Sequence, residues 1–314
     1  MATEPLPYLD YGGAMRQRLG GRAQKLSIDA HLGCPNRDGT VAHGGCTFCL
    51  GEAFSPSYCR RSATITEQID RGIEFHHWRG RHSDIYLAYF QSGTNTHASC
   101  DKLRRLYVEA LSHPSISGIV VATRPDAIDS EKLELLDSLR SKGYVAVEYG
   151  IESVYDTTLN HVNRGHTFAD TQRAIAATKQ RGIDIGAHLI LGLPSESRED
   201  IVRSIDTINS LQPNFLKLHQ LQIYRGTAMA EEWALYPERF LFGNGDATEE
   251  YVSLLVDIVR RLHPEIALER LVSEAPRSLL LHSPLGGIRP DAVRNEVVGR
   301  MLRAGFRQGD LYIP

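Results

Sequence analysis

Apolar positions along the chain form short runs that alternate with longer segments in which apolar residues recur every three or four positions. The short runs predict buried strands, and the periodic segments predict amphipathic helices. Six such pairs follow one another at fairly even spacing, which favours a parallel sheet with helical crossovers. The expected strands are 25–31, 84–90, 118–122, 145–149, 185–191 and 215–223.

The segments between the strands carry helix start signals. Thr64 and Glu67 have the spacing of a capping box ahead of an apolar stripe. Ser197 is placed to begin a later helix. The expected helices are 64–78, 100–111, 168–181, one that carries Leu133, Leu136 and Leu139, and one that begins at Ser197.

The number of repeats predicts the fold class. Six repeats are fewer than the eight strands of a closed barrel. We therefore predict an α/β fold, a partial (β/α)6 TIM-like barrel with its site at the C-terminal strand ends. Beyond residue 225, helices near 248–262 and 291–303 and a strand near 267–271 predict a C-terminal α/β extension. We expect a core over 1–225 and an extension over 226–314 that covers the barrel.

Composition and charge narrow the class of protein. The chain has 42% hydrophobic and 23% charged residues, which is ordinary for a globular protein. It has no membrane-length apolar run and no apolar leader, so we expect a cytoplasmic protein without membrane contact. The net charge of −3 does not favour an extensive nucleic-acid surface. Local basic clusters could contact phosphates or be solvated faces: Arg16, Arg18, Arg22 and Lys25, and Arg289, Arg294, Arg300, Arg303 and Arg307.

Three of the five cysteines lie together after the first expected strand, in the run HLGCPNRDGTVAHGGCTFC. Cys34, Cys46 and Cys49 have the spacing C-x11-C-x2-C, without a fourth cysteine at ligand spacing. Three thiolates can bind a metal centre and leave one position open for chemistry. The alternative is a structural zinc site with His31 or His43 as the fourth ligand. A place at the C-terminal end of a strand favours the catalytic centre.

Polar residues on the expected inner faces of the strands are candidate catalytic residues. Lys217 and His219 share one face of the sixth strand, because alternate residues of a strand point the same way. His188 and Tyr89 are expected to face the same interior. With Gln91, Asn95 and Arg124 these residues could line a polar substrate cavity, and a hydrogen-bonded core is the alternative.

Further motifs follow in order along the chain: YFQSGTNTHA, TRPD, VEYGIES, NRGHT and HLILGLPSE. Together with the cysteine run and Phe48 between two cysteines, they resemble the radical S-adenosylmethionine (SAM) enzymes. More closely, residues 8–225 resemble the bacterial subfamily related to the Elongator catalytic subunit. The resemblance implies a [4Fe–4S] cluster on the three cysteines, with S-adenosylmethionine on the fourth iron. Its reductive cleavage would give a 5′-deoxyadenosyl radical that abstracts hydrogen, while the protein binds, orients and excludes water.

The resemblance also implies cofactor contacts. In relatives, the positions of Glu148, Glu152 and Ser153 bind the ribose hydroxyls, and a carboxylate can accept from both hydroxyls of a diol. Arg164 matches the arginine that pairs with the methionine carboxylate. Where most relatives have a Gly-Gly-Glu run, this chain has Gln-Ser-Gly-Thr at 91–94. The remaining expected contacts are Phe48, Gln91, Ser92, Ile190, Gly192 and Leu221.

The substrate implied by the resemblance is transfer RNA. The implied step removes the carboxymethyl group of a 5-carboxymethylaminomethyl wobble uridine and leaves the aminomethyl group. A flavodoxin- or ferredoxin-type protein would supply electrons, and acetyl transfer is not expected without an acetyltransferase domain. The alternatives are a radical enzyme with a small-molecule or peptide substrate, and a zinc- or cluster-stabilised binding protein. We expect Cys59 and Cys100 to be ordinary residues.

Overall fold

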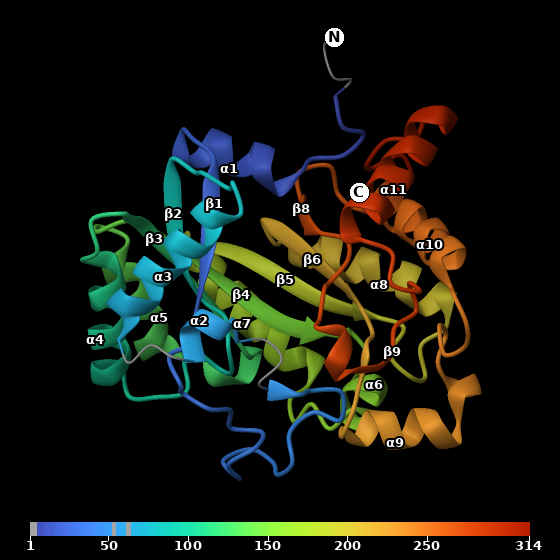
Figure 1. The fold of residues 1–314 in the computed structure, drawn as a ribbon, viewed down its shortest axis with the longest axis horizontal. Helices are drawn as coiled ribbons and strands as arrows, with labels where there is room; N and C mark the ends of the chain where they lie inside the picture. The colour runs from blue at the N-terminus through green and yellow to red at the C-terminus, as the bar shows by residue number, and fades with distance from the viewer. Residues whose placement is uncertain (1–4, 52–54, 61–63) are drawn as a thin grey trace.

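A curled sheet forms the centre of the molecule in a computed structural model that describes residues 5–51, 55–60 and 64–314 (Figure 1). Seven parallel strands follow the order β1-β2-β3-β4-β5-β6-β8. They are β1 (Ala23–Ile28), β2 (Ile85–Phe90), β3 (Ile116–Thr123), β4 (Tyr144–Glu152), β5 (Asp184–Leu191), β6 (Phe215–Gln220) and β8 (Ala267–Arg270). The predicted α/β partial barrel is confirmed, with one strand more than expected.

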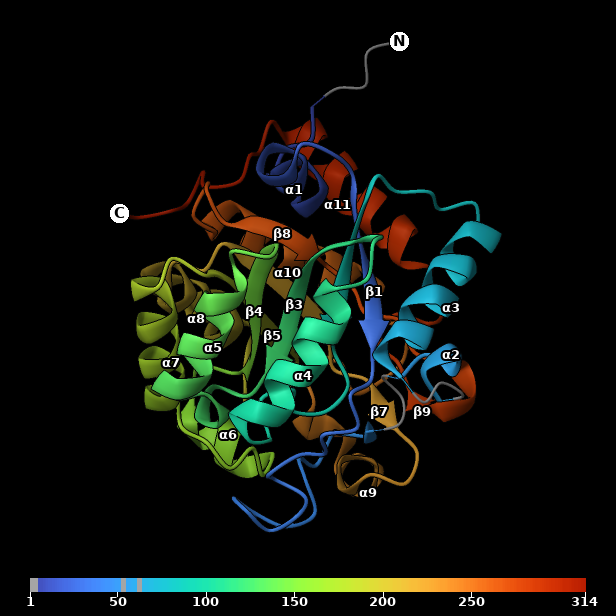
Figure 2. The ribbon, with the colours of Figure 1, turned by 90° about the vertical axis from the view of Figure 1, so that its left-hand side faces the viewer.

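Helices cover the outer face of this sheet, and Figure 2 shows several of them side by side. Two predicted helix starts are confirmed by their capping boxes, at Thr64 with Glu67 and at Ser197 with Asp200. The helices are α1 (Tyr11–Leu19), α2 (Ser57–Arg60), α3 (Ile65–Trp78), α4 (Cys100–Leu111), α5 (Ser130–Leu139), α6 (Asp156–His161), α7 (Phe168–Gln180), α8 (Arg198–Leu211), α9 (Ala228–Leu235), α10 (Thr248–Arg261) and α11 (Pro290–Ala304).

The strands alternate between two faces. In β2, Ala88 and Phe90 pack into the core under the outer helices, whereas Leu87 packs inside the barrel against Ala14 and Met15 of α1. Helix α1 therefore closes the N-terminal end of the barrel, and the interior opens at the C-terminal strand ends. The sequence analysis missed this helix, because the glycines at 12–13 in its first turn disfavour helix.

The C-terminal extension belongs partly to the sheet itself. Strand β8 pairs with β6, with Phe215 opposite Ala267, and α10 packs against α8 and α11. The strand expected over 215–223 was too long, since β6 ends at Gln220. The next two residues lead into β7 (Ile223–Tyr224), which pairs antiparallel with β9 (Leu280–His282). The core boundary near residue 225 stays a prediction.

Candidate active site

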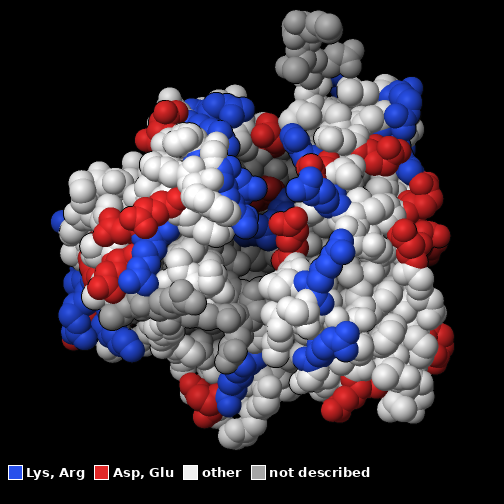
Figure 3. All heavy atoms as spheres, viewed as in Figure 1, with Lys and Arg blue, Asp and Glu red and all other residues white. Residues whose placement is uncertain are grey.

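A cavity of about 1660 Å³ opens at the C-terminal ends of the strands. Figure 3 shows a hollow in the middle of this face, with acidic and basic side chains inside and around it. Residues from widely separated parts of the sequence meet on its wall. The expected site residues that line it are Cys34, Cys46, Phe48, Cys49, Tyr89, Gln91, Ser92, Glu152, Arg164, His188, Ile190, Lys217, His219 and Leu221.

The loop that carries the cysteines is held in shape by its own backbone. Arg37 N–H donates to the Cys34 carbonyl (2.9 Å), and Cys49 N–H donates to the Cys46 carbonyl (3.0 Å), which forms the CxxC turn. The amide of Asn163 donates to the Gly45 carbonyl (2.8 Å) and ties this loop to the segment after α6. The loop therefore presents its thiols at one wall of the cavity.

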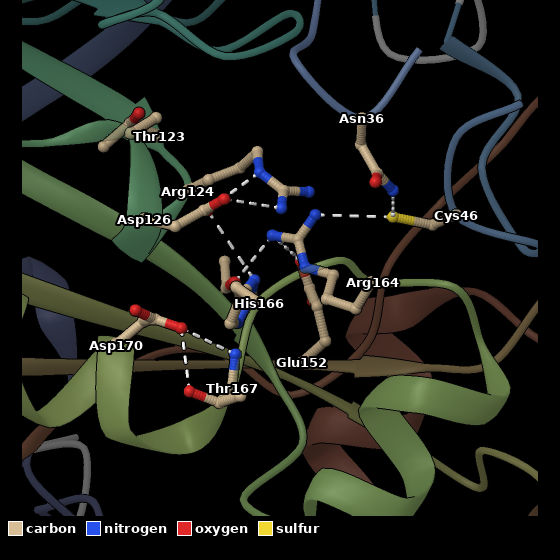
Figure 4. Close-up of polar contacts among 12 residues, drawn as sticks. Asn36, Cys46, Thr123, Arg124, Asp126, Glu152, Arg164, His166, Thr167 and Asp170 are labelled. Carbon is tan, nitrogen blue, oxygen red and sulfur yellow. Dashed lines mark hydrogen bonds and ion pairs between the residues drawn. The ribbon is translucent and has the colours of Figure 1, made fainter. Parts of the chain in front are cut away.

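Cys46 is the buried member of the three and accepts two hydrogen bonds at its sulfur (Figure 4). Arg164 Nη1 lies 3.4 Å and Asn36 Nδ2 3.5 Å from the Cys46 Sγ. Arg164 also donates to the Gly150 carbonyl (2.7 Å) and pairs with Glu152 (3.4 Å). Burial alone would lower the pKa of Arg164, but Cys46 and Glu152 raise it, so the guanidinium stays charged.

The zinc alternative finds no support in this geometry. His31 is exposed and pairs with Asp29 (3.2 Å), and His43 lies against Gly39. Within the described part of the chain, no three His, Cys, Asp or Glu side chains are arranged to hold a single metal ion. Three free thiols on an open cavity wall do fit a larger cluster with an unligated corner. Burial raises the pKa of the Cys49 thiol to about 11, so ligation would displace its proton.

Glu148 lies beneath the cavity floor, on the inner face of β4. Its carboxylate bonds to Tyr89 Oη (2.7 Å), His188 Nε2 (2.7 Å) and Lys217 Nζ (3.2 Å). It also pairs with Lys25. Burial alone would raise the pKa of this carboxyl, but the ammonium groups of Lys217 and Lys25 hold that pKa well below its usual range. Glu148 is therefore an ionised anchor for the floor.

Glu269 of β8 completes the charge balance at the floor. Its carboxylate binds Lys217 Nζ (2.9 Å) and Lys25 Nζ (2.7 Å). The three N–H groups of Lys217 are occupied by Tyr89, Glu148 and Glu269. The expectation that Lys25 belongs to an exposed basic cluster is wrong, because two glutamates bind it in the interior. The sequence analysis missed Glu269, although a charge in the apolar-flanked strand ALER was the available signal.

Two histidines stand above this charged floor. The rings of His188 and His219 lie 5.5 Å apart, and both line the cavity. Burial and the neighbouring His188 hold the pKa of His219 well below its usual value, so His219 is neutral. Because the ionised Glu148 can only accept, His188 Nε2 carries the hydrogen of this bond. The pair can form hydrogen bonds with a ligand in the cavity.

Three residues that were expected to contact the cofactor do not line the cavity. Glu148, Ser153 and Gly192 are not among the described residues that line the cavity. Ser153 is buried and donates to Glu196, and a side chain at Gly192 would collide with Phe242. The geometry supports Glu152, the neighbour at the end of β4, as the carboxylate that faces the cavity.

The Gln-Ser-Gly-Thr segment braces the cysteine loop. Thr94 N–H donates to the Gly33 carbonyl (2.9 Å), directly before the first cysteine. Gly93 has φ +75°, and a Cβ there would lie 2.6 Å from the Gly33 oxygen. Asn95 was expected to line the cavity, but its amide binds the Phe90 and Ala122 carbonyls (2.9 Å each). The backbone of this segment thus sets the loop position.

The sequence analysis missed two buried polar residues behind the cysteine loop, Asn36 and His166, although they lie in the CPN and RGH segments. Arg124, which was expected at the cavity, lines it and forms two hydrogen bonds with Asp126 (both 2.9 Å). Burial, with Arg164 and Arg124 nearby, lowers the pKa of His166 to about 2. Figure 4 shows these side chains grouped beside Asn36 and Cys46. They form a rigid polar wall around the loop.

The remaining two cysteines are outside this arrangement. The Cys59 thiol is buried and donates to the Ser27 carbonyl (3.2 Å), and burial raises its pKa to about 12. Cys100 begins α4. Neither lines the cavity within the described residues. No described helix combines the length and apolar character needed to cross a bilayer.

Comparison with known proteins agrees with the geometry. Residues 32–208 match the profile of the radical SAM superfamily, and residues 213–301 match the radical SAM C-terminal domain. Protein YhcC of Escherichia coli (strain K12) is 35% identical over 86% of this chain and 85% of its own length. A tRNA uridine(34) acetyltransferase of Methanocaldococcus infernus is 28% identical over 40% of this chain and 23% of its own.

A solved structure supports the fold. The archaeal Elp3 of Methanocaldococcus infernus, with an N-terminal deletion, superimposes with a TM-score of 0.67 at 16% identity. The match covers 91% of this chain and 64% of that one. The chain therefore belongs to the radical SAM superfamily, whose members are enzymes that use a [4Fe–4S] cluster and S-adenosylmethionine, as the motifs predicted.

Proposed function

We propose that this radical SAM enzyme acts on the side chain of a modified wobble uridine in transfer RNA. The reaction converts 5-carboxymethylaminomethyl uridine and water into the aminomethyl form and glyoxylate. It begins with loss of a hydrogen atom from the carboxymethyl methylene next to the amine. Loss of one further electron, which would return to the oxidised cluster, and of one proton gives an imine that water hydrolyses after the radical step. When bound, the cluster and S-adenosylmethionine supply the 5′-deoxyadenosyl radical that takes the hydrogen atom. The residues of the chain bind both partners and exclude water.

The observation that carries the proposal is one cavity that joins the cysteine loop to a polar floor. Its volume of about 1660 Å³ exceeds the usual range of small-ligand pockets, roughly 300–1,000 Å³. It therefore has room for the cofactor and a protruding nucleoside side chain together. Cys34, Cys46 and Cys49 would hold the cluster at one wall, and His188 and His219 lie above the charged floor.

We assign roles by position on the cavity wall. Glu152 and Arg164 lie beside the cysteine loop, where they can bind the ribose and carboxylate of the cofactor. His188, held by Glu148, lines the cavity, where its ring can form a hydrogen bond with the substrate. The other proposed cofactor contacts are Phe48, Gln91, Ser92, Ile190 and Leu221, and the other proposed substrate contacts are Tyr89, Lys217 and His219.

Relatives and local charge support an RNA substrate. One relative bears the name tRNA uridine(34) acetyltransferase. Arg270 and Arg294 lie at the cavity and can meet backbone phosphates beside the inserted base. Arg300, in contrast, is paired with Glu249 and Glu296. A few arginines at the mouth and a net charge of −3 fit a local RNA footprint.

The proposal includes a reducing environment and an electron source. All five cysteines are free thiols, and their clustering fits a cytoplasmic metalloenzyme better than a disulfide framework. A flavodoxin- or ferredoxin-type protein would deliver the electron to the cluster beside the cysteine loop.

The test incubates the reduced, cluster-loaded enzyme and S-adenosylmethionine with transfer RNA from a strain rich in the carboxymethylaminomethyl nucleoside. Mass spectrometry of the nucleosides should show that form decrease and the aminomethyl form increase in step with 5′-deoxyadenosine. Cys46→Ala is the matched control and should give neither product.

A second outcome would point to another substrate class. If 5′-deoxyadenosine forms but the nucleoside profile does not change, the enzyme acts on a small molecule or peptide. A salt titration of transfer-RNA binding is an independent check, because contacts with phosphates give affinity that falls steeply with salt.

A further inference from the structure

The three thiols of the site have unequal surroundings. Cys46 is buried, whereas Cys34 and Cys49 are half-buried. In residues 5–51, 55–60 and 64–314, hydrogen bonds onto these three sulfurs fall on Cys46 alone, from Asn36 and Arg164. Any cluster held by the three thiolates would therefore have one ligand that is stabilised more strongly than the others.

The orientation of Asn36 is determined by its neighbours. Its side chain is fully buried, and one Nδ2 hydrogen donates to the Asn163 carbonyl (2.6 Å). The other points to Cys46 Sγ at 3.5 Å. Turning the amide over would place Oδ1 against the Asn163 carbonyl oxygen, which is repulsive. The backbone carbonyl of Asn36 also accepts from Gly45 N–H (2.8 Å), so the residue is fixed at both ends.

Arg164 places a positive charge beside the same sulfur. Its side chain is 8% exposed, and the Gly150 carbonyl and Glu152 hold its second amino group. A buried charge interacts strongly with its surroundings because water does not screen it. Cys46 therefore faces both a neutral donor and a cationic donor.

We propose that Asn36 and Arg164 are positioning residues that raise the reduction potential of the cluster through Cys46. A reduced cluster carries additional negative charge that is shared with its thiolate ligands. N–H donors and a buried cation stabilise that charge, and hydrogen bonds to the sulfurs are known determinants of cluster potential. The inference depends on superfamily membership and is independent of the proposed RNA substrate.

The proposal gives a role to the long spacing between the first two cysteines. Asn36 lies in this eleven-residue gap, and Pro35 accepts from Val41 N–H (2.8 Å) within it. The loop returns to Asn36 just before the second cysteine, where Gly45 N–H donates to the Asn36 carbonyl. The gap thus supplies a donor to the sulfur.

The experiment is an anaerobic redox titration of the cluster-loaded full chain, followed by electron paramagnetic resonance. Asn36→Leu keeps the branched shape of the side chain and removes the donor, so the midpoint potential should shift to a more negative value at unchanged iron content. Asn36→Asp replaces the donor with a negative charge and should shift it further in the same direction.

Thr40→Val is the matched control in the same loop. The Thr40 hydroxyl donates to Asp38 (2.6 Å), so the change removes a hydrogen bond within the loop without altering a charge or either hydrogen bond onto Cys46. This change should leave the potential unchanged. Equal shifts in Asn36→Leu and Thr40→Val would mean general loosening of the loop and would overturn the proposal.

Two further results decide the remaining cases. An unchanged potential in a fully loaded Asn36→Leu variant would also refute the role of Asn36. If that variant does not load the cluster, Asn36→Ala replaces it, because alanine removes the donor without adding bulk to the buried loop. An alanine variant with the parent's potential would overturn the proposal.

Discussion

Gly93 illustrates how a single residue can control the cavity wall. It adopts φ +75°, and an added Cβ would lie 2.6 Å from the Gly33 carbonyl oxygen. Only glycine meets both conditions without strain. The close approach positions the residue that precedes Cys34.

Gly93→Ala should therefore destabilise the fold and reduce the iron content of the reconstituted protein. The matched control is Gly80→Ala, which has φ +66° but no atom within 4 Å of its added Cβ. Gly80→Ala should reduce the free energy of unfolding by about 1–2 kcal/mol, because of the left-handed backbone alone. Urea unfolding and iron analysis compare the two variants. Equal losses in the free energy of unfolding together with equal iron contents would contradict the proposed close contact.

Glu196 should make stability depend on pH. Burial raises the pKa of its carboxyl to about 7, above the model-peptide value of about 4.3. Its contribution is present below the unfolded-state pKa and is lost as pH rises through about 7. Between pH 5 and pH 8 the free energy of unfolding of the parent protein should fall by roughly 2–3 kcal/mol relative to that of Glu196→Gln. Urea unfolding at both pH values checks this, and a constant difference would refute it.

At the scale of elements, the inner charges connect strands that are distant in sequence. Lys25 of β1 and Lys217 of β6 are bound by Glu148 of β4 and Glu269 of β8. Each charge is compensated only when all four strands have assembled. The floor of the cavity and the closure of the sheet therefore depend on one another.

Lys217→Met should reduce the free energy of unfolding by about 3–5 kcal/mol, because it leaves two buried carboxylates undercompensated. The control is Arg203→Met, since Arg203 is largely exposed and 4.0 Å from Asp200. Its cost should be at most about 1 kcal/mol. Adding Glu269→Gln to Lys217→Met should recover part of the loss, and the absence of recovery would argue against direct coupling.

At the scale of the whole molecule, the extension completes the barrel. Strand β8 covers the edge of β6, α10 packs against α8, and Leu268 N–H donates to the Leu9 carbonyl (2.8 Å) near the start of the described chain. The segment before α1 thus meets strand β8 of the extension.

A chain that ends at residue 225 should accordingly fail to fold cooperatively. It would expose the edge of β6 and leave Lys217 and Lys25 without Glu269. Circular dichroism during urea unfolding would show a broad, weak transition in place of the sharp transition of the full chain. A sharp transition in the shortened chain would establish 1–225 as an independent domain.

Much of the fold was predictable because it depends on local patterns. The period-two alternation in β6 predicted that Lys217 and His219 share the inner face, and both line the cavity. Helix α1 and strand β8 were harder to interpret. Helix α1 has two glycines in its first turn. Strand β8 is only four residues long, which is too short for its side-chain pattern to show which strand it pairs with.

The sequence by itself determined the succession of strands and helices along the chain, the shared face of Lys217 and His219, and the three cysteines at the end of the first strand, since each follows from local spacing. Only the tertiary structure decided which polar residues face the cavity. Glu148 and Glu152 lie on the same strand. The negative charge of Glu148 is compensated by lysines beneath the floor, whereas Glu152 lines the cavity. The physical reason is that the lysines that pair with Glu148 come from strands more than sixty residues away.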